Sequence, residues 1–214
     1  LGRFYNEGSD KFNIEVNLDK AYELYKYCYD NKYDKSAYSL GCLLTIKNSK
    51  HHNPKKAVSY FEEAYKTNKD LAAYALGQVY YEGIGAEVDL EKAYNYFVEA
   101  SKLGNKNANY YIAKYYYNGL CVVDAPDYET SYKIAKELID QDYLDEINIF
   151  LAVKSLYNLG KDQEALKLIQ NTLKKKEDSY TTKLPLLKFI GVTAILLTFI
   201  IFNFMLAGDR EPAL

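Results

Sequence analysis

The sequence has no tryptophan, one methionine, four prolines, three cysteines and two histidines among its 214 residues. The cysteines, Cys28, Cys42 and Cys121, form neither a Cys-x-x-Cys pair nor an even set, so no disulfide framework is predicted. The histidines, His51 and His52, are adjacent and have no acidic or cysteine partner at ligand spacing. They therefore predict a solvated loop pair rather than a metal site.

An excess of charge of one sign is missing too. The chain carries 27 basic and 29 acidic residues, a net charge of -2, and no basic stripe recurs along one face. Nucleic acid is therefore not an expected partner. No glycine loop is followed by the Lys-Ser/Thr of a phosphate-binding loop, and no arrangement of Ser, His and Asp suggests a nucleophile. We expect no enzymatic activity, no cofactor and no small-molecule substrate.

What the sequence does contain is an internal repeat of 36 residues. A Leu-Gly pair, a Tyr-Phe pair and two alanines recur at this spacing. They are Leu40-Gly41 and Leu76-Gly77, Tyr60-Phe61 and Tyr96-Phe97, Ala57 and Ala93, and Ala64 and Ala100. So many coincidences at one period indicate a stack of similar units. Cys28 falls in the column of Ala64 and Ala100, where a small buried residue with a structural role is predicted.

Each unit is predicted to form two amphipathic helices, and the clearest unit runs from residue 71 to 104. Its first half places Tyr74, Leu76, Gly77 and Tyr80 at helical spacing, and its second half does the same with Ala93, Tyr96, Phe97 and Ala100. Between the halves, Gly83 and Gly85 supply the positive φ that a tight turn between helices needs. Gly119 keeps the first of these turn glycines in the next unit.

The second helix of each unit is predicted to begin at a good capping residue. The four capping positions each precede the first repeat alanine, or its equivalent, by four residues. They are Asn17, Asn53, Asp89 and Asp127. A side-chain oxygen at this position accepts a hydrogen bond from an otherwise unpaired amide of the first turn, worth about 1 kcal/mol.

The run AxYxLGxxYxxGxG, followed by Asp or Asn and then KAxxYFxxA, resembles the Sel-one-like repeat, a relative of the tetratricopeptide repeat. The resemblance implies an all-α solenoid of antiparallel helix pairs that holds other proteins. The predicted repeats are a partial unit at 1–34 and units at 35–70, 71–106 and 107–144. Residues 145–177 are predicted to be a divergent helix pair that caps the stack, since a terminal unit has no outer neighbour. Because residue 1 falls in mid-repeat, we expect the chain to be the C-terminal part of a longer one.

A candidate partner surface lies on the first helices, which line the concave face in solenoids of this kind. Gln78, Tyr81, Lys114 and Tyr117 occupy columns between the core positions of these helices. Aromatic residues with a polar tip are enriched at binding hot spots, so we predict that these four contribute to protein binding. A neighbouring column of tyrosines is predicted to belong to the core.

After a predicted linker at 178–188, residues 189–207 read FIGVTAILLTFIIFNFMLA without a charge. A helix of this length is about 28 Å long, close to the ~30 Å hydrocarbon core of a bilayer. We predict a single transmembrane helix and a short tail at 208–214. The alternative is a fully buried core helix, which a slender solenoid has no interior to surround. Asn203 within the span either pairs with a partner helix or lies near enough to the interface to reach water.

Two features disagree about the side of the membrane on which the repeats lie. Five lysines precede the span and only Arg210 follows it, which favours a tail-anchored protein with cytosolic repeats. The absence of any Asn-x-Ser/Thr glycosylation acceptor points the same way. The whole arrangement, however, resembles the membrane adaptor subunit of the ubiquitin ligase used in endoplasmic-reticulum-associated degradation. NIFLAVKSL at 148–156 is similar to the helix that this family carries before its span.

That resemblance implies luminal repeats, which hold the ligase and substrate-recruiting partners, in the membrane of the endoplasmic reticulum. The alternative is a tail-anchored scaffold that faces the cytosol or lies in a mitochondrial membrane. Both alternatives describe a single-pass membrane protein without catalytic activity.

Overall fold

The computed structural model describes residues 2–8, 15–33, 35–120, 125–141 and 146–181, with side chains as far as residue 175. Every regular element in these ranges is a helix, which confirms the predicted all-α fold for this part of the chain. The helices are α1 (Gly2–Glu7), α2 (Leu18–Asp30), α3 (Ser36–Leu44), α4 (Pro54–Thr67), α5 (Lys69–Glu82), α6 (Leu90–Lys102), α7 (Lys106–Asn118), α8 (Tyr128–Asp140), α9 (Glu146–Asn158) and α10 (Asp162–Thr181).

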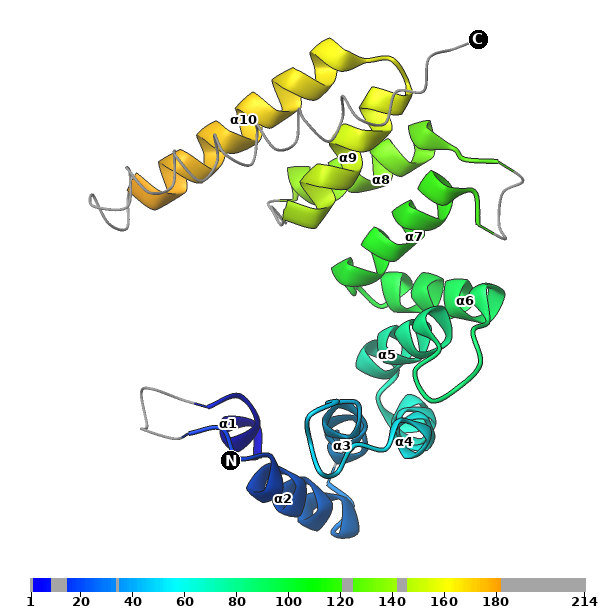
Figure 1. Cartoon of the computed structure of the whole chain (residues 1–214), viewed down its shortest axis with the longest axis vertical. Helices are drawn as coiled ribbons and strands as arrows, with labels where there is room; N and C mark the ends of the chain where they lie inside the picture. Colours follow the sequence, from blue (N-terminus) through cyan, green and yellow to red (C-terminus); the bar gives the residue numbers. More distant parts are fainter. Residues whose placement is uncertain (1, 9–14, 34, 121–124, 142–145, 182–214) are drawn as a thin grey trace.

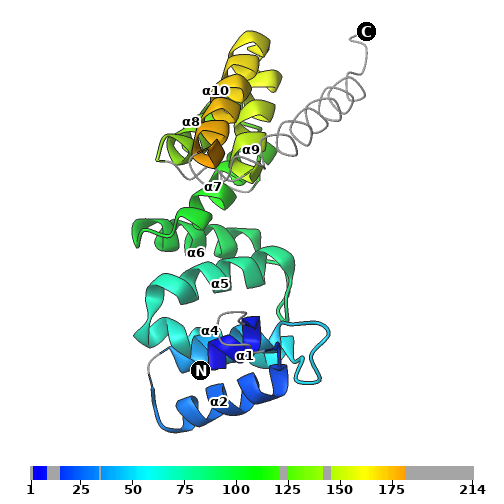
Figure 2. The same cartoon turned by 90° about the vertical axis from the view of Figure 1, so that its left-hand side faces the viewer.

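The helices stack in antiparallel pairs into a curved solenoid. Figure 1 shows α3, α5 and α7 on the inside of the curve and α4 and α6 on the outside. Figure 2 shows the same pairs following one another from α2 at one end to α10 at the other. From α3 to α6, each unit therefore presents its first helix to the concave side and its second helix to the convex side.

The linker predicted at 178–188 begins too early, because α10 continues to Thr181. No glycine or proline interrupts the chain between Asp162 and Thr181, and the intervening lysines and glutamates are good helix formers. Among the described residues, no helix is long and apolar enough to cross a membrane. The predicted span at 189–207 and the tail at 208–214 lie outside the described residues.

The four predicted capping residues all stand at the start of a second helix and accept the same kind of hydrogen bond. In each case a side-chain oxygen receives the backbone N–H of the residue three positions later. The bonds are Asn17 to Lys20 at 3.0 Å, Asn53 to Lys56 at 3.1 Å, Asp89 to Lys92 at 2.9 Å and Asp127 to Thr130 at 2.9 Å. Each bond satisfies one amide that the helix itself leaves unpaired.

The turn glycines determine how far the first helices extend. α5 and α7 end at Gly83 and Gly119, which have φ of 72° and 62° in the left-handed region. In the second unit, Lys47 and Ser49 stand in place of the two turn glycines. Its first helix, α3, ends at Leu44, two residues before the position that corresponds to the end of α5 at Glu82. A side chain opposes the left-handed conformation, so α3 ends earlier and a longer turn follows it.

Glycines on the first helices are required because aromatic rings face them. A Cβ atom on Gly41 would lie 2.5 Å from the ring of Phe61, and one on Gly77 would lie 2.6 Å from the ring of Phe97. In the fourth unit the aromatic position, eight residues after the cap, holds Ala135, and the glycine position holds Ala113. A small residue on one helix therefore makes room for a large one on the other, and the requirement relaxes where both are small.

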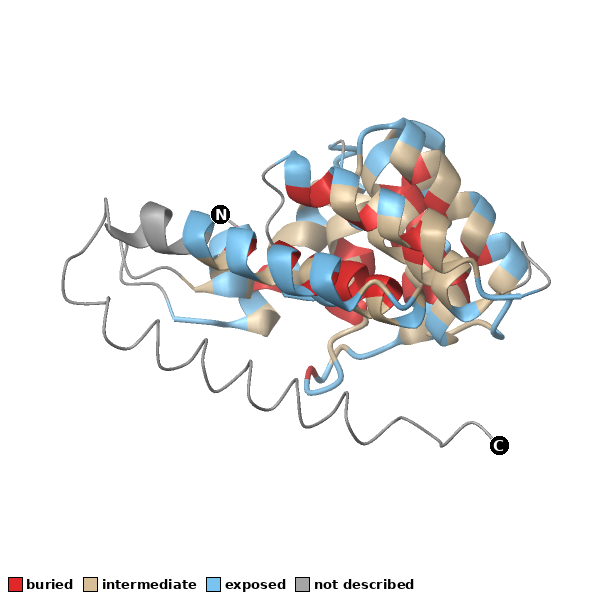
Figure 3. Cartoon of the chain, turned by 90° about the horizontal axis from the view of Figure 1, so that it is seen from above, coloured by how far each residue is buried: buried red, intermediate tan, exposed pale blue. Residues whose placement is uncertain are grey.

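Buried residues, coloured red in Figure 3, lie mainly on the helices of the stack. They form two clusters that share no residue. The first extends from Leu40 on α3 to Tyr115 on α7. The second extends from Ala135 on α8 through α9 to Leu168 on α10. The repeats thus share one core as far as α7, and the last three helices have a core of their own.

Cys28 is only half-buried, unlike Ala64 and Ala100, which are 1% and 0% exposed in the same column. The first helices that flank it, α1 and α3, have 6 and 9 residues and cover less of α2 than longer helices would. Cys121 lies outside the described residues.

The second helices are linked to one another along the convex side by pairs of tyrosine and glutamate. The Tyr29 hydroxyl on α2 donates to Glu63 on α4 over 2.6 Å, and Tyr65 on α4 makes the same bond to Glu99 on α6. Because each phenol donates to a carboxylate, its deprotonation is opposed, and the pKa of both tyrosines rises to about 12. The bonds repeat with the units and tie each one to the next.

These bonds predict a loss of stability at alkaline pH. The folded-state pKa lies above the ordinary value of 10, so the contribution is complete below pH 10 and is lost as pH rises through about 12. Both tyrosines are partly exposed, so we expect less than about 1 kcal/mol from each pair. Ultraviolet difference absorbance follows the ionisation of the phenols in the native chain, and Tyr29 and Tyr65 should be among those that ionise late. In Glu63→Gln/Glu99→Gln these two should ionise earlier, and an unchanged titration would contradict the assignment.

Candidate functional site

The concave side carries three columns of side chains that the neighbouring helices leave partly uncovered. Units repeat every 36 residues up to α7, and α9 follows with an offset of 40, from Lys106 to Glu146 at the helix starts. We call the twelve residues at these registers the inner strip. They are Tyr38, Tyr74, Tyr110 and Phe150; Cys42, Gln78, Lys114 and Lys154; and Thr45, Tyr81, Tyr117 and Tyr157. All are half-buried except Phe150, which is 44% exposed.

Three of the four residues predicted for partner binding come together on α5 and α7. The Nε2 atom of Gln78 donates to the Tyr111 hydroxyl over 3.3 Å. The Nζ atom of Lys114 lies 5.0 Å from the centre of the Tyr81 ring, and that ring is 5.3 Å from the ring of Tyr111. The three side chains therefore form one polar and aromatic cluster around Tyr111.

Tyr117, the fourth predicted residue, belongs to a different part of the strip. Its hydroxyl accepts a hydrogen bond from Nδ2 of Asn158 on α9 over 2.9 Å. Its ring meets that of Tyr128 on α8 edge to face at 5.3 Å. Tyr117 thus connects α7 to the last helix pair rather than to Tyr81.

Sequence reasoning missed that α9 continues the inner strip with Phe150, Lys154 and Tyr157. The segment was predicted to be a divergent cap, because its offset from α7 is 40 rather than 36 residues. An alignment that allowed the longer offset would have placed Lys154 beneath Lys114 and Tyr157 beneath Tyr117. The strip therefore extends onto α9 and, with Tyr38 and Cys42, onto α3, beyond the two helices on which a partner surface was predicted.

Two tyrosines of α7 that support the strip were also missed. Tyr115 is fully buried, and its hydroxyl donates to the Leu90 carbonyl over 2.8 Å. Tyr111 stacks on Phe97 with 4.3 Å between ring centres. One unit earlier their positions hold Val79 and Ala75, so comparison of the repeats gives no sign of aromatic packing there.

Electrostatics within the strip distinguish its polar members. Burial lowers the pKa of Lys114. The hydrogen bond to the Tyr81 hydroxyl and the electrostatic interaction with the same group have the opposite effect, and together the influences leave the pKa of Lys114 raised. Lys114 is therefore a cation at neutral pH. Burial raises the pKa of the Cys42 thiol. Burial also raises the pKa of the Tyr38 hydroxyl, and the neighbouring Cys42 thiol adds to this effect. A thiol that resists ionisation is a poor nucleophile, so Cys42 acts as a packing residue.

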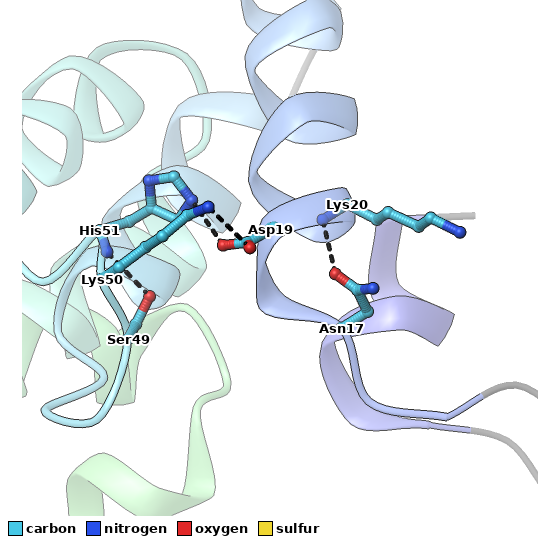
Figure 4. Close-up of polar contacts among 6 residues, drawn as sticks. All are labelled: Asn17, Asp19, Lys20, Ser49, Lys50 and His51. Atoms are coloured by element: carbon cyan, nitrogen blue, oxygen red, sulfur yellow. Dashed lines mark hydrogen bonds and ion pairs between the residues drawn. The ribbon is translucent and has the colours of Figure 1, made fainter.

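A second polar cluster, shown in Figure 4, joins the first two units outside the strip. One carboxylate oxygen of Asp19 lies 3.0 Å from His51 Nε2 and the other lies 2.7 Å from Lys50 Nζ. The hydrogen bond from Lys50 is the main reason that the pKa of Asp19 is lowered. The His51 ring also stacks on Tyr22 at 4.0 Å. The prediction of solvated loop histidines therefore holds for His52, which is exposed, and is wrong for His51.

The Asp19 partner could not be predicted because it lies 32 residues from His51 and meets it only when the units stack. The cluster contains one histidine and one carboxylate. Within the ranges that the structure describes, no group of three or more His, Cys, Asp or Glu side chains is placed to hold a metal ion.

Comparison with known proteins identifies the repeat. The sequence pattern of a family described as Sel1 repeat matches residues 1–29, 48–66, 70–105 and 106–143. The crystal structure of a Sel1 repeat protein from Oxalobacter formigenes is similar to this chain with a TM-score of 0.64 and 20% identity, over 81% of this chain and 68% of that one.

A protective antigen with an SLR fold from uropathogenic Escherichia coli is similar with a TM-score of 0.55 and 20% identity. The match covers 80% of this chain and 39% of the antigen. At such identities these likenesses concern the fold alone. No curated protein matches the chain.

Proposed function

The chain belongs to the Sel1 repeat family, and from this premise we propose that it is a non-enzymatic scaffold that holds other proteins. Sel1 repeat proteins generally mediate protein–protein interactions. The observation that carries the proposal is the inner strip, where aromatic and polar side chains stand partly uncovered on consecutive helices. Tyrosine, the commonest residue of the strip, is enriched among the few hot-spot residues that carry most of the affinity in protein interfaces.

We further propose that residues 189–207 anchor this scaffold in the membrane of the endoplasmic reticulum as an adaptor of a ubiquitin ligase complex in protein degradation. The uncharged run of nineteen residues supports the anchor. The likeness of residues 148–156 to the helix that precedes the span in that adaptor family supports the specific role. The alternative, supported by the lysines before the span, is a tail-anchored scaffold facing the cytosol or in a mitochondrial membrane.

One experiment tests both the scaffold and its side of the membrane. Asn107→Thr creates a glycosylation acceptor at Asn105, in the turn between α6 and α7. In the same chain, a photo-crosslinking amino acid replaces Tyr157 of the inner strip. Expression in eukaryotic cells should give a glycosylated chain, sensitive to endoglycosidase, that crosslinks to discrete proteins on irradiation.

Two matched chains control this experiment. Asn105→Gln beside Asn107→Thr removes the acceptor and should abolish the shift in mass. The crosslinker at Tyr27, which is 65% exposed on α2, should capture fewer proteins than at Tyr157. An unmodified chain whose repeats are digested by added protease would support the cytosolic alternative. The absence of any crosslinked protein at Tyr157 would contradict the scaffold itself.

A further inference from the structure

The charged members of the inner strip are both lysines. Lys114 on α7 and Lys154 on α9 occupy the same column on consecutive first helices. Among the described residues, neither has a carboxylate within ion-pair distance, and each instead lies against an aromatic ring. Lys114 Nζ is 5.0 Å from the centre of Tyr81, and Lys154 Nζ is 5.1 Å from the centre of Phe150.

Other lysines in the described chain form ion pairs with carboxylates of the same chain. Lys161 lies 3.2 Å from Glu129, and Lys50 lies 2.7 Å from Asp19. Lys114 and Lys154 are half-buried, so part of the water that would solvate each ammonium group is already displaced. A partly desolvated cation gains most from an anionic partner. The strip therefore offers two unmatched positive charges to an occupant.

Apolar surface lies directly beside these charges. Phe150 is 44% exposed and Ile147, one turn earlier on α9, is 54% exposed. The hydroxyl-bearing rings of Tyr110 and Tyr157 belong to the flanking columns. An occupant that places an apolar side chain against Phe150 would cover surface that the fold leaves in water.

Resting on the proposed scaffold function, we infer that the strip between α7 and α9 binds an extended protein segment in which acidic residues stand next to an aromatic or aliphatic one. Packed helices lie about 8–10 Å apart, and an extended chain advances about 3.3 Å per residue. Two carboxylates two or three positions apart therefore reach both lysines. A nucleic acid fits less well, because two lysines neutralise few phosphates and the chain has a net charge of -2.

The test is a selection of randomised dodecapeptides displayed on phage against the full chain in detergent micelles. Enriched peptides should contain more Asp and Glu than the starting library, beside Phe, Tyr or Leu. A synthetic copy of an enriched peptide should lose affinity by about tenfold or more for Lys114→Glu/Lys154→Glu, measured by fluorescence anisotropy. Lys114→Gln/Lys154→Gln, which removes charge without reversing it, should lose less.

The control makes the same change of net charge on the convex side. Lys66 and Lys102 are exposed and occupy one register on α4 and α6. Lys66→Glu/Lys102→Glu should keep the affinity of the native chain within about twofold. Circular dichroism of all variants confirms that they remain helical.

Three outcomes would overturn the inference. The first is enrichment of neutral or basic peptides. The second is an acidic peptide that binds Lys114→Glu/Lys154→Glu as well as it binds the native chain. The third is an oligonucleotide that binds through these lysines while acidic peptides do not. None of these outcomes touches the scaffold proposal, which fails separately if the crosslinker at Tyr157 captures no protein.

Discussion

Gly85→Ala is expected to lower the free energy of unfolding by about 3 kcal/mol. Gly85 has φ of 77°, where a side chain costs about 1–2 kcal/mol. A Cβ atom there would also lie 2.3 Å from the backbone carbonyl of Pro54, the first residue of α4 in the preceding unit. Neither backbone can move without disturbing a helix, so crowding adds about 1–3 kcal/mol. Denaturant unfolding followed by circular dichroism measures the loss.

Gly160→Ala separates these two costs. Gly160 forms the turn before α10 with φ of 70°, but among the described residues no atom beyond its chain neighbours lies within 4 Å of the position that its Cβ would occupy. Alanine should therefore cost only the backbone strain, about 1–2 kcal/mol. Equal losses for the two variants would show that the turn of the third unit does not press against Pro54 in solution.

Phe97→Ala is expected to cost about 3–5 kcal/mol, because the ring is fully buried and stacks on Tyr111. Gly77→Ala alone should cost about 1–3 kcal/mol by pushing a methyl group to within 2.6 Å of that ring. In the double variant the methyl group enters the space that the ring has left. The combined loss should therefore fall below the sum of the two single losses by about 1 kcal/mol or more.

The equivalent pair of the second unit supplies the control. Phe61 faces Gly41 rather than Gly77, so Gly77→Ala and Phe61→Ala should add. Chemical denaturation of the five variants gives both sums. Additivity in Gly77→Ala/Phe97→Ala would contradict the tight contact that explains the glycine column. The fourth unit, with Ala113 and Ala135 at these positions, contains the natural counterpart of the double variant.

Features that depend on a few consecutive residues were predictable from the sequence. The capping oxygens of Asn17 and Asp127, the positive φ of Gly83 and the pairing of helices follow from short patterns that the repeat presents several times. The early end of α3 could also have been expected, since Lys47 and Ser49 replace both turn glycines. Local chemistry determines these features, and repetition makes the pattern visible.

Contacts between units were not predictable in the same way. Tyr29 meets Glu63 and Asp19 meets His51 across 34 and 32 residues, distances that depend on how the units stack. Comparison of the repeats also hides residues in which one unit differs from the others, and Tyr115 in the column of Val79 is the clearest case. The candidate surface was accordingly found on α5 and α7 but not on α9.

The division of the core into two clusters bears on what a ligand of the inner strip would span. The first cluster ends on α7 and the second begins on α8, so the cores on either side of this boundary are each continuous. Lys114 and Lys154 stand on opposite sides of the boundary, on α7 and α9. A ligand that bridges them would contact both parts of the stack at once and so hold the last three helices at one orientation relative to the repeats before them.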